Sequence, residues 1–202
     1  MFMGRAKEPG TNNPAIIGGK RVAAALKALW DATGNDNPYA DWALLRHEQT
    51  IKEVQRRLRR ELQAAEKELV EQQSRGIKLS VLRSENPKVL NLGFKSPYGF
   101  AVASLIAEFD YYVRVQKTLA RKNIRSDEQV RQAITELTRF VRRVFNETAR
   151  FDRWLMRAEM KGLCRADFIP DAAADSKARV EFAVGVFGMV PSEIYSTKLQ
   201  PR

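Results

Sequence analysis

Cysteine and histidine are almost missing from this 202-residue sequence, which contains Cys164 and His47 and no other residue of either type. With one cysteine, no disulfide can form within the chain, and a zinc site built from cysteine and histidine lacks its ligands. We therefore expect no metal site. We expect His47, which falls in a charged helical stretch, at the surface or in packing. Cys164 is expected to be a small buried hydrophobe rather than a reactive thiol.

Long apolar runs are missing as well. The most apolar stretch is Val184–Val190, which contains two glycines and is far too short to span a bilayer. The first residues also lack the apolar stretch of a signal peptide. We expect a protein without membrane contact that stays in the reducing compartment where it is made, the cytoplasm of a bacterium.

Motifs of enzymes are absent too. The chain has no glycine-rich phosphate loop, no HExxH, GxSxG or CxxC motif, and no pair of carboxylates placed for acid–base work. We therefore predict a protein that is not an enzyme, with no catalytic residue, no cofactor and no small-molecule substrate.

What the sequence has in excess is positive charge. It contains 35 lysines and arginines against 24 aspartates and glutamates, which gives a formal net charge of +11 at pH 7. Hydrophobic residues make up 44% of the chain, enough for a globular core. Such a surplus draws a protein towards polyanions, and charge alone does not choose among DNA, RNA and acidic lipid.

Helical periodicity covers most of the chain. The longest pattern runs from about residue 38 to 73 and ends at Gly76, with apolar residues recurring every three, four and seven positions. Further helices are expected at about 20–32, 97–121, 126–155 and 173–187. Ser96-Pro97 supplies a capping serine and a first-turn proline, and Ser126 with Gln129 forms a capping-box pattern.

A short β interval is expected between these helices. Ile77, Leu79 and Val81 alternate with polar residues, a period of two that indicates a strand, and residues 88–94 are a second strand candidate. We predict a mainly α fold with this short central β segment. The predicted divisions are a flexible arm at 1–19, a single domain at 20–190 with a strand-helix-helix core at about 77–150, and a tail at 191–202.

Two arginine clusters lie on the predicted helices. The first surrounds more than one face of the long helix, and either follows a phosphate backbone or forms the solvated flank of a coiled coil. Its members are Arg56, Arg57, Arg59 and Arg60. The second places several arginines on one helical face, for which we favour a solvated surface; it comprises Arg139, Arg142, Arg143, Arg150, Arg153 and Arg157.

The β interval is a further candidate for contact with DNA. A strand presenting Lys88, Asn91 or Lys95 suits the major groove, where base edges match lysine and asparagine side chains. Lys78, on the first strand candidate, is a further candidate contact. In proteins that read DNA with a β-ribbon, two chains supply one strand each, so this arrangement requires a homodimer.

The helix that begins after Ser126 offers a phosphate site in the same arrangement. Its N-terminus, with Arg125 before it, suits a phosphate oxygen. The alternative is that the two strands form a plain structural hairpin and that Ser126 is only a cap.

Three segments resemble a known family. They are Lys95-Ser96-Pro97-Tyr98-Gly99, Ala107-Glu108-Phe109-Asp110-Tyr111-Tyr112-Val113-Arg114 and Phe151-Asp152-Arg153-Trp154. They are similar to the AcaB-like transcriptional regulators encoded on conjugative plasmids and integrating conjugative elements, over about residues 75–165. The resemblance implies a ribbon-helix-helix-like core, which the long N-terminal helix and a C-terminal helical extension would enlarge, a dimer and a role in regulating transfer genes.

The combined prediction is a dimeric DNA-binding transcriptional regulator of conjugation or element-maintenance genes, with double-stranded DNA as its partner. The alternative is a non-enzymatic scaffold or interaction protein of an integrating conjugative element. In that case the helix at 38–73 would bind a protein partner and the positive charge would be generic.

Overall fold

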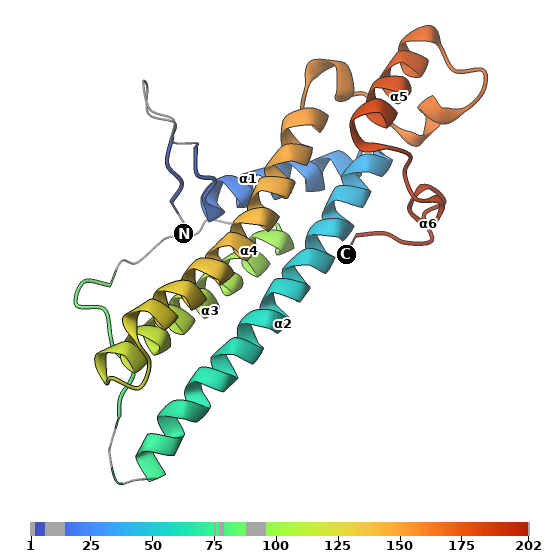
Figure 1. Ribbon diagram of the computed structural model, residues 1–202. Helices are drawn as coiled ribbons and strands as arrows, with labels where there is room; N and C mark the ends of the chain where they lie inside the picture. Colours follow the sequence, from blue (N-terminus) through green and yellow to red (C-terminus); the bar gives the residue numbers. More distant parts are fainter. Residues whose placement is uncertain (1–2, 7–14, 75, 77–78, 88–95, 202) are drawn as a thin grey trace.

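The computed structural model describes residues 3–6, 15–74, 76, 79–87 and 96–201, most of which are helical (Figure 1). The long helices are α1 (Gly19–Thr33), α2 (Pro38–Ser74), α3 (Pro97–Arg121), α4 (Asp127–Leu155) and α5 (Ala174–Phe187). Three short elements follow α4 or α5: the 3-10 helices η1 (Ala158–Met160) and η2 (Arg165–Phe168) and the single turn α6 (Ser192–Tyr195). The five long helices predicted from periodicity are confirmed, with nearly the same bounds.

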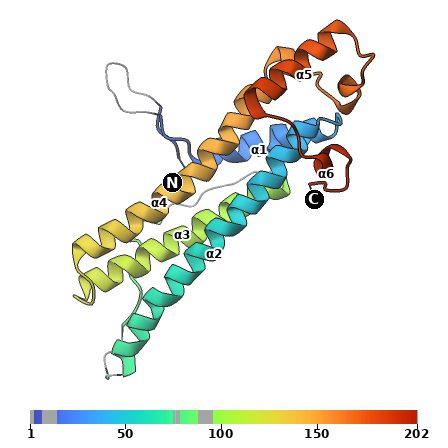
Figure 2. The same cartoon turned by 45° about the vertical axis from the view of Figure 1, so that its right-hand side comes forward.

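Helices α2 and α3 lie side by side and run in the same direction (Figures 1 and 2). Early in the pair, Arg59 of α2 donates two hydrogen bonds to Glu108 of α3, at 3.4 and 3.0 Å. Further along both helices, the Tyr111 hydroxyl donates to Glu66 at 2.9 Å. The order of these contacts along both helices shows that α2 and α3 are parallel.

Helix α4 runs antiparallel to both and completes a three-helix bundle. Arg46, near the start of α2, pairs with Glu147, whereas Arg57 in its middle pairs with Glu136. Helix α1 crosses one end of the bundle and contacts all three helices (Figures 1 and 2). One hydrophobic core joins the four; its largest fully buried side chains include Leu26, Leu29, Leu44, Leu58, Leu105, Tyr112, Leu137, Phe145 and Leu155.

The turn between α3 and α4 follows from local signals. Asn123 has a φ of 53°, and its N–H and that of Ile124 donate to the carbonyls of Ala120 and Leu119. This Schellman arrangement ends α3. The predicted capping box is confirmed, because Ser126 Oγ accepts from the Gln129 N–H at 3.2 Å while Gln129 Oε1 accepts from the Ser126 N–H at 2.9 Å.

The predicted strand at 77–81 is wrong in its described part, and the predicted strand at 88–94 lies outside the described residues. Residues 79–87, which we call the strap, contact the last turns of α3 and form no strand. Leu79 and Val81 pack against a small apolar cluster between α2 and α3, and the Leu82 N–H donates to Thr118 Oγ1 at 3.0 Å. Ser80 between them is exposed, so the alternation over residues 79–81 reflects packing against the bundle.

The predicted ribbon-helix-helix-like core with a central β segment is also wrong. Within the described ranges no residue belongs to a β-strand, and the β pairing there is one isolated bridge between Arg5 and Ile16. Helices α3 and α4 share their core with α1 and α2 of the same chain. They therefore belong to a four-helix core within one chain. In a ribbon-helix-helix protein, two such helices would instead pack against strands from two chains.

The C-terminal segment packs on the end of the bundle where α2 begins. Phe187 of α5 stacks on Phe151 of α4, with ring centroids 4.8 Å apart and the planes 5° from parallel. The Tyr39 hydroxyl at the start of α2 donates to the Gly188 carbonyl at 2.8 Å. In the predicted tail, Ile194 is buried. The division of the chain into an arm, a domain and a tail stays a prediction.

Candidate nucleic-acid interface

The outer side of α4 carries six arginines. This helix is strongly amphipathic: one side buries apolar residues such as Leu137, Val141 and Val144, and the opposite side is exposed. We define the α4 arginine face as the six exposed residues Arg139, Arg142, Arg143, Arg150, Arg153 and Arg157, the last of which lies just beyond the helix end. With 3.6 residues per turn, the five that lie on the helix project within about 60° of one line along it.

This face is long and nearly straight. At about 1.5 Å of rise per residue, the distance from Arg139 to Arg153 along the axis is roughly 21 Å. Asn146, also exposed, occupies the same line midway between the arginines. The face therefore presents a row of guanidinium groups interrupted by one neutral amide.

Within the part of the chain that the structure describes, none of the six arginines forms an ion pair. The acidic side chains on this half of α4 turn towards neighbouring helices and are paired there: Glu136 with Arg57, Glu147 with Arg46 and Asp152 with Arg21. Arg21 Nη2 lies 2.5 Å from Asp152 Oδ2, and the Asp152 side chain is only 6% exposed. The positive charge of the outer face is therefore not compensated by the carboxylates that the sequence places beside it.

The other contacts of these arginines do not neutralise them either. Arg150 donates to the Val186 carbonyl at 3.3 Å, and the guanidinium carbon of Arg157 lies 3.9 Å from the centre of the Trp154 ring. Arg143 lies 5.9 Å from the centre of the Phe140 ring, which Arg57 also approaches. Carbonyl and ring contacts orient the side chains while leaving each formal charge in place.

Six exposed like charges over such a length raise the local potential. Most neighbouring arginines on the face lie about 6 Å or less apart along the axis, within the Debye length of about 8 Å at physiological salt, so their fields add; between Arg143 and Arg150, about 10 Å apart, screening is stronger. The row suits an extended polyanion, because each guanidinium can contact a separate phosphate and release its counterions.

The four arginines of the predicted α2 cluster point to three different surroundings: helix α4, helix α3 and the solvent. Arg57 Nη2 lies 3.6 Å from Glu136 Oε2 on α4, and Arg59 pairs with Glu108 on α3. Arg56 and Arg60 are exposed and form no ion pair with any described residue. Two of the four predicted contacts therefore join helices in the bundle, and two face the solvent.

Arg125 is bound inside the molecule. Its guanidinium donates to Glu68 of α2 and, at 2.9 Å, to Gln116 Oε1, and its side chain is 21% exposed. The hydrogen bond with Glu68 raises the pKa of Arg125. A phosphate contact by Arg125 would require it to leave these partners. That contact, and the one at the N-terminus after Ser126, stay predictions.

The remaining predicted contacts are Lys78, Lys88, Asn91 and Lys95, all of which lie outside the described residues. The sequence analysis interpreted the α4 arginines as solvated surface and did not recognise them as a candidate binding face. The periodic spacing was visible, but the partners of Glu136, Glu147 and Asp152 were not, because they come from helices about 80 to 130 residues away.

Other candidate chemistry is limited. In the described ranges no three His, Cys, Asp or Glu side chains gather where a metal ion could bind. His47 is buried and packs in the bundle, and Cys164 is a half-buried free thiol at the start of η2. None of the helices in the same ranges has the length and apolar character needed to cross a bilayer.

Comparison with known proteins adds a family. A family model described as "Transcriptional regulator AcaB" matches residues 1–202. No curated protein and no solved structure is found to match the chain. The match extends well beyond the segments that carry the sequence resemblance and includes the α4 arginine face.

Proposed function

We propose, from the premise that the chain belongs to the AcaB family of transcriptional regulators, that it regulates genes by binding double-stranded DNA through the α4 arginine face. The observation that carries this proposal is the row of six exposed arginines without ion pairs among the described residues. A regulator of transcription acts on DNA, which favours DNA over RNA or acidic lipid as the polyanion.

The chemistry of the face suits phosphates better than bases. Arginines that follow a helix axis contact phosphates on the edges of a groove, and such contacts position a protein without selecting a sequence. Asn146 is the exposed amide on the same line, and asparagine can form a bidentate pair with adenine. We therefore propose that α4 supplies affinity and orientation. The base contacts predicted for Lys88 and Asn91 stay a prediction.

The regulated genes and the oligomeric state are proposed from the sequence resemblance to AcaB-like regulators. We propose that the regulated genes serve conjugation or maintenance of a mobile element, that the protein acts in the cytoplasm, and that it binds as a homodimer. A dimer would present two α4 faces related by a twofold axis, which suits a palindromic operator. Sedimentation equilibrium of the full chain with and without DNA tests the dimer separately.

The scaffold alternative has less support. It requires a long helix whose apolar stripe is free for a protein partner. In α2 that stripe, including Leu44, Val54 and Leu58, is buried in the core of the bundle. No specific observation therefore favours the alternative.

The DNA proposal is tested by measuring affinity for the element's promoter fragments and for random DNA across a salt series. Each phosphate contact contributes about 0.9 to the slope of log K against log salt. The triple variant Arg139→Gln, Arg142→Gln, Arg153→Gln removes three exposed guanidinium groups that have no hydrogen bond to a described residue. We expect its slope to be less steep by about 3 and its affinity for both DNAs to fall.

A matched control removes the same charge elsewhere. The variant Lys67→Gln, Lys177→Gln, Lys198→Gln changes three exposed lysines on α2, α5 and the C-terminal segment. We expect a smaller change in slope, from net charge alone. Equal slopes for the two triple variants would refute the assignment to α4, and an absence of preference for any promoter fragment would refute the regulator mechanism.

A further inference from the structure

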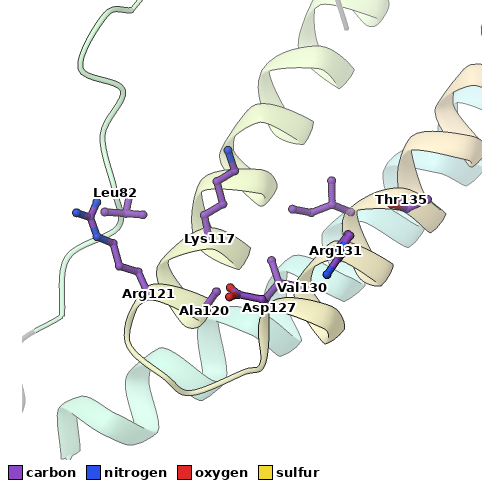
Figure 3. A pocket seen from close by; sticks show the side chains of 9 residues that line it. Leu82, Lys117, Ala120, Arg121, Asp127, Val130, Arg131 and Thr135 are labelled. Atoms are coloured by element: carbon purple, nitrogen blue, oxygen red, sulfur yellow. The ribbon is translucent and has the colours of Figure 1, made fainter.

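A pocket of about 590 Å³ lies at the end of the bundle where α3 turns into α4 (Figure 3). Three segments wall it: the last turns of α3, the first turns of α4 and the strap. It is separate in sequence from the α4 arginine face, which begins at Arg139, and its volume falls in the range of pockets for small molecules. Its lining is Leu82, Lys117, Ala120, Arg121, Asp127, Val130, Arg131, Ile134 and Thr135.

The wall formed by the strap is held in place. The Leu82 N–H donates to Thr118 Oγ1 at 3.0 Å, and Leu79 and Val81 before it pack against the small apolar cluster between α2 and α3. Thr118 itself is fully buried and donates to the Arg114 carbonyl at 2.7 Å. These contacts fix the position of the strap at Leu82 beside the end of α3.

The floor of the pocket is apolar. Its apolar lining residues are Leu82 of the strap, Ala120 of α3, and Val130 and Ile134 of α4. Ile134 is half-buried and packs against the main core. An apolar surface in a concavity gains from being covered by an apolar body, at about 25 cal/mol per Å² removed from water.

The rim is positively charged. Lys117 and Arg121 lie one turn apart on α3, are exposed, and form no ion pair with a described residue. Like charges at this spacing on a helix repel each other. Arg131 pairs with Glu128, but both side chains are more than 70% exposed, so the pair is weak. Against these three cations the lining contains one carboxylate, that of Asp127.

We propose that this pocket binds a small amphipathic organic anion, with a carboxylate or phosphate between Lys117 and Arg121 and an acyl or aryl body on the floor. An anion there relieves the repulsion between the two cations and forms charge-assisted hydrogen bonds with both. Inorganic phosphate would leave the apolar floor uncovered, so we expect it to bind more weakly than an amphipathic anion. The inference goes beyond the proposed function and does not depend on DNA binding.

The test uses the full chain and 8-anilinonaphthalene-1-sulfonate, a fluorescent amphipathic anion, as the probe. Octanoate and octyl phosphate compete as carboxylate and phosphate ligands, and octanol is the uncharged match. We expect one saturable site from which both anions displace the probe at concentrations at least tenfold lower than octanol does. If octanol displaces the probe at the same concentration as the anions, the cations of the rim do not contribute to binding and the proposal is wrong.

Variants locate the site. Lys117→Gln, Arg121→Gln should weaken probe binding about tenfold, because two charge-assisted contacts are lost. Leu82→Ser, on the surface strap, should weaken it through the floor while keeping the backbone hydrogen bond with Thr118. The control Arg142→Gln, Arg143→Gln removes the same charge from the α4 arginine face. If this control loses the probe and the pocket variants keep it, the proposal is overturned.

Discussion

His47 of α2 and Thr148 of α4 form a buried hydrogen bond, with Nδ1 lying 2.8 Å from Oγ1. The Thr148 hydroxyl has one hydrogen, which it donates to the Val144 carbonyl at 3.0 Å. Nδ1 therefore carries the proton and donates to Thr148, and Nε2 is left as a buried acceptor with no partner among the described residues. This arrangement accommodates neutral histidine and has no place for the cation.

The first prediction concerns pH. Burial lowers the pKa of His47 to about 4 from 6.5. The unfolded chain takes up the proton first as the pH falls, so this contribution to stability is complete above pH 6.5 and is lost between pH 6.5 and 4. We expect His47 to remove about 2 kcal/mol from the free energy of unfolding at pH 5. Urea titrations at pH 7 and 5 measure it.

The comparison variant for pH is His47→Leu, which fills the site without a titrating group. Other groups titrate in both proteins, so the difference between their pH profiles isolates the histidine. Parallel profiles from pH 7 to 5 would show that His47 is not held in its neutral form.

The second prediction concerns Arg165, which joins η2 to the start of α2 and to α6. Its guanidinium lies 2.7 Å from Asp41 Oδ2 and donates to the carbonyls of Ile194 and Tyr195, each at 2.8 Å. The side chains of Arg165 and Asp41 are 13% and 7% exposed. Arg165→Met leaves a buried carboxylate, and we expect a loss of about 3 kcal/mol in unfolding free energy.

Two further variants separate charge from packing at Arg165. Adding Asp41→Asn should recover part of the loss, because the uncompensated charge disappears. Arg131→Met, which breaks an exposed pair with Glu128, should change the stability by less than about 0.5 kcal/mol. Equal effects of Arg165→Met and Arg131→Met would contradict a joining role for Arg165.

The third prediction tests the strap. Thr118→Val keeps the shape of the side chain but leaves the Leu82 N–H without its acceptor. We expect a loss of about 1 kcal/mol and faster proteolysis within residues 79–87. The control Thr138→Val, at a half-buried position of α4, should alter neither quantity. Unchanged proteolysis in Thr118→Val would mean that this hydrogen bond does not hold the strap.

The fourth prediction is a gain of DNA affinity. Glu147 lies between Arg143 and Arg150 in sequence but pairs with Arg46 of α2. Glu147→Gln removes a negative charge beside the α4 arginine face, and we expect DNA to bind about twofold more tightly at low salt. Glu128→Gln, the same change at the far end of the helix, should have less effect. An equal gain in both variants would reflect net charge alone.

The helices were predictable because their signals are local. Ser126 and Gln129 mark the start of α4, and the apolar spacing from Val130 onward gives its buried side. The strand prediction at 77–81 was wrong because alternating apolar residues indicate that one side of a segment is covered, but not whether a sheet or helices cover it. An extended segment packed on helices and a strand in a sheet can both give a period of two, and the sequence does not show which surface covers the segment.

The candidate site was predictable in position but not in charge. The arginine spacing on α4 indicates a shared face, and sequence alone would pair Glu147 with Arg143 or Arg150 on the same helix. In the structure Glu147 turns to Arg46, and Asp152 turns to Arg21 of α1. Which carboxylates neutralise a surface depends on helix packing, and this packing places them on distant parts of the chain.

The strap also connects two segments of the chain, each of which contributes only part of the hydrophobic core. Residues 83–87 are exposed, and they separate a segment carrying α1 and α2 from one carrying α3, α4 and the C-terminal elements. Neither segment contains a whole core, and pairs such as Arg46 with Glu147 and Glu68 with Arg125 cross between them. We therefore expect two separately expressed fragments, divided at the strap, to assemble into one bundle. Fused to two other proteins, such fragments would report when those proteins come into contact.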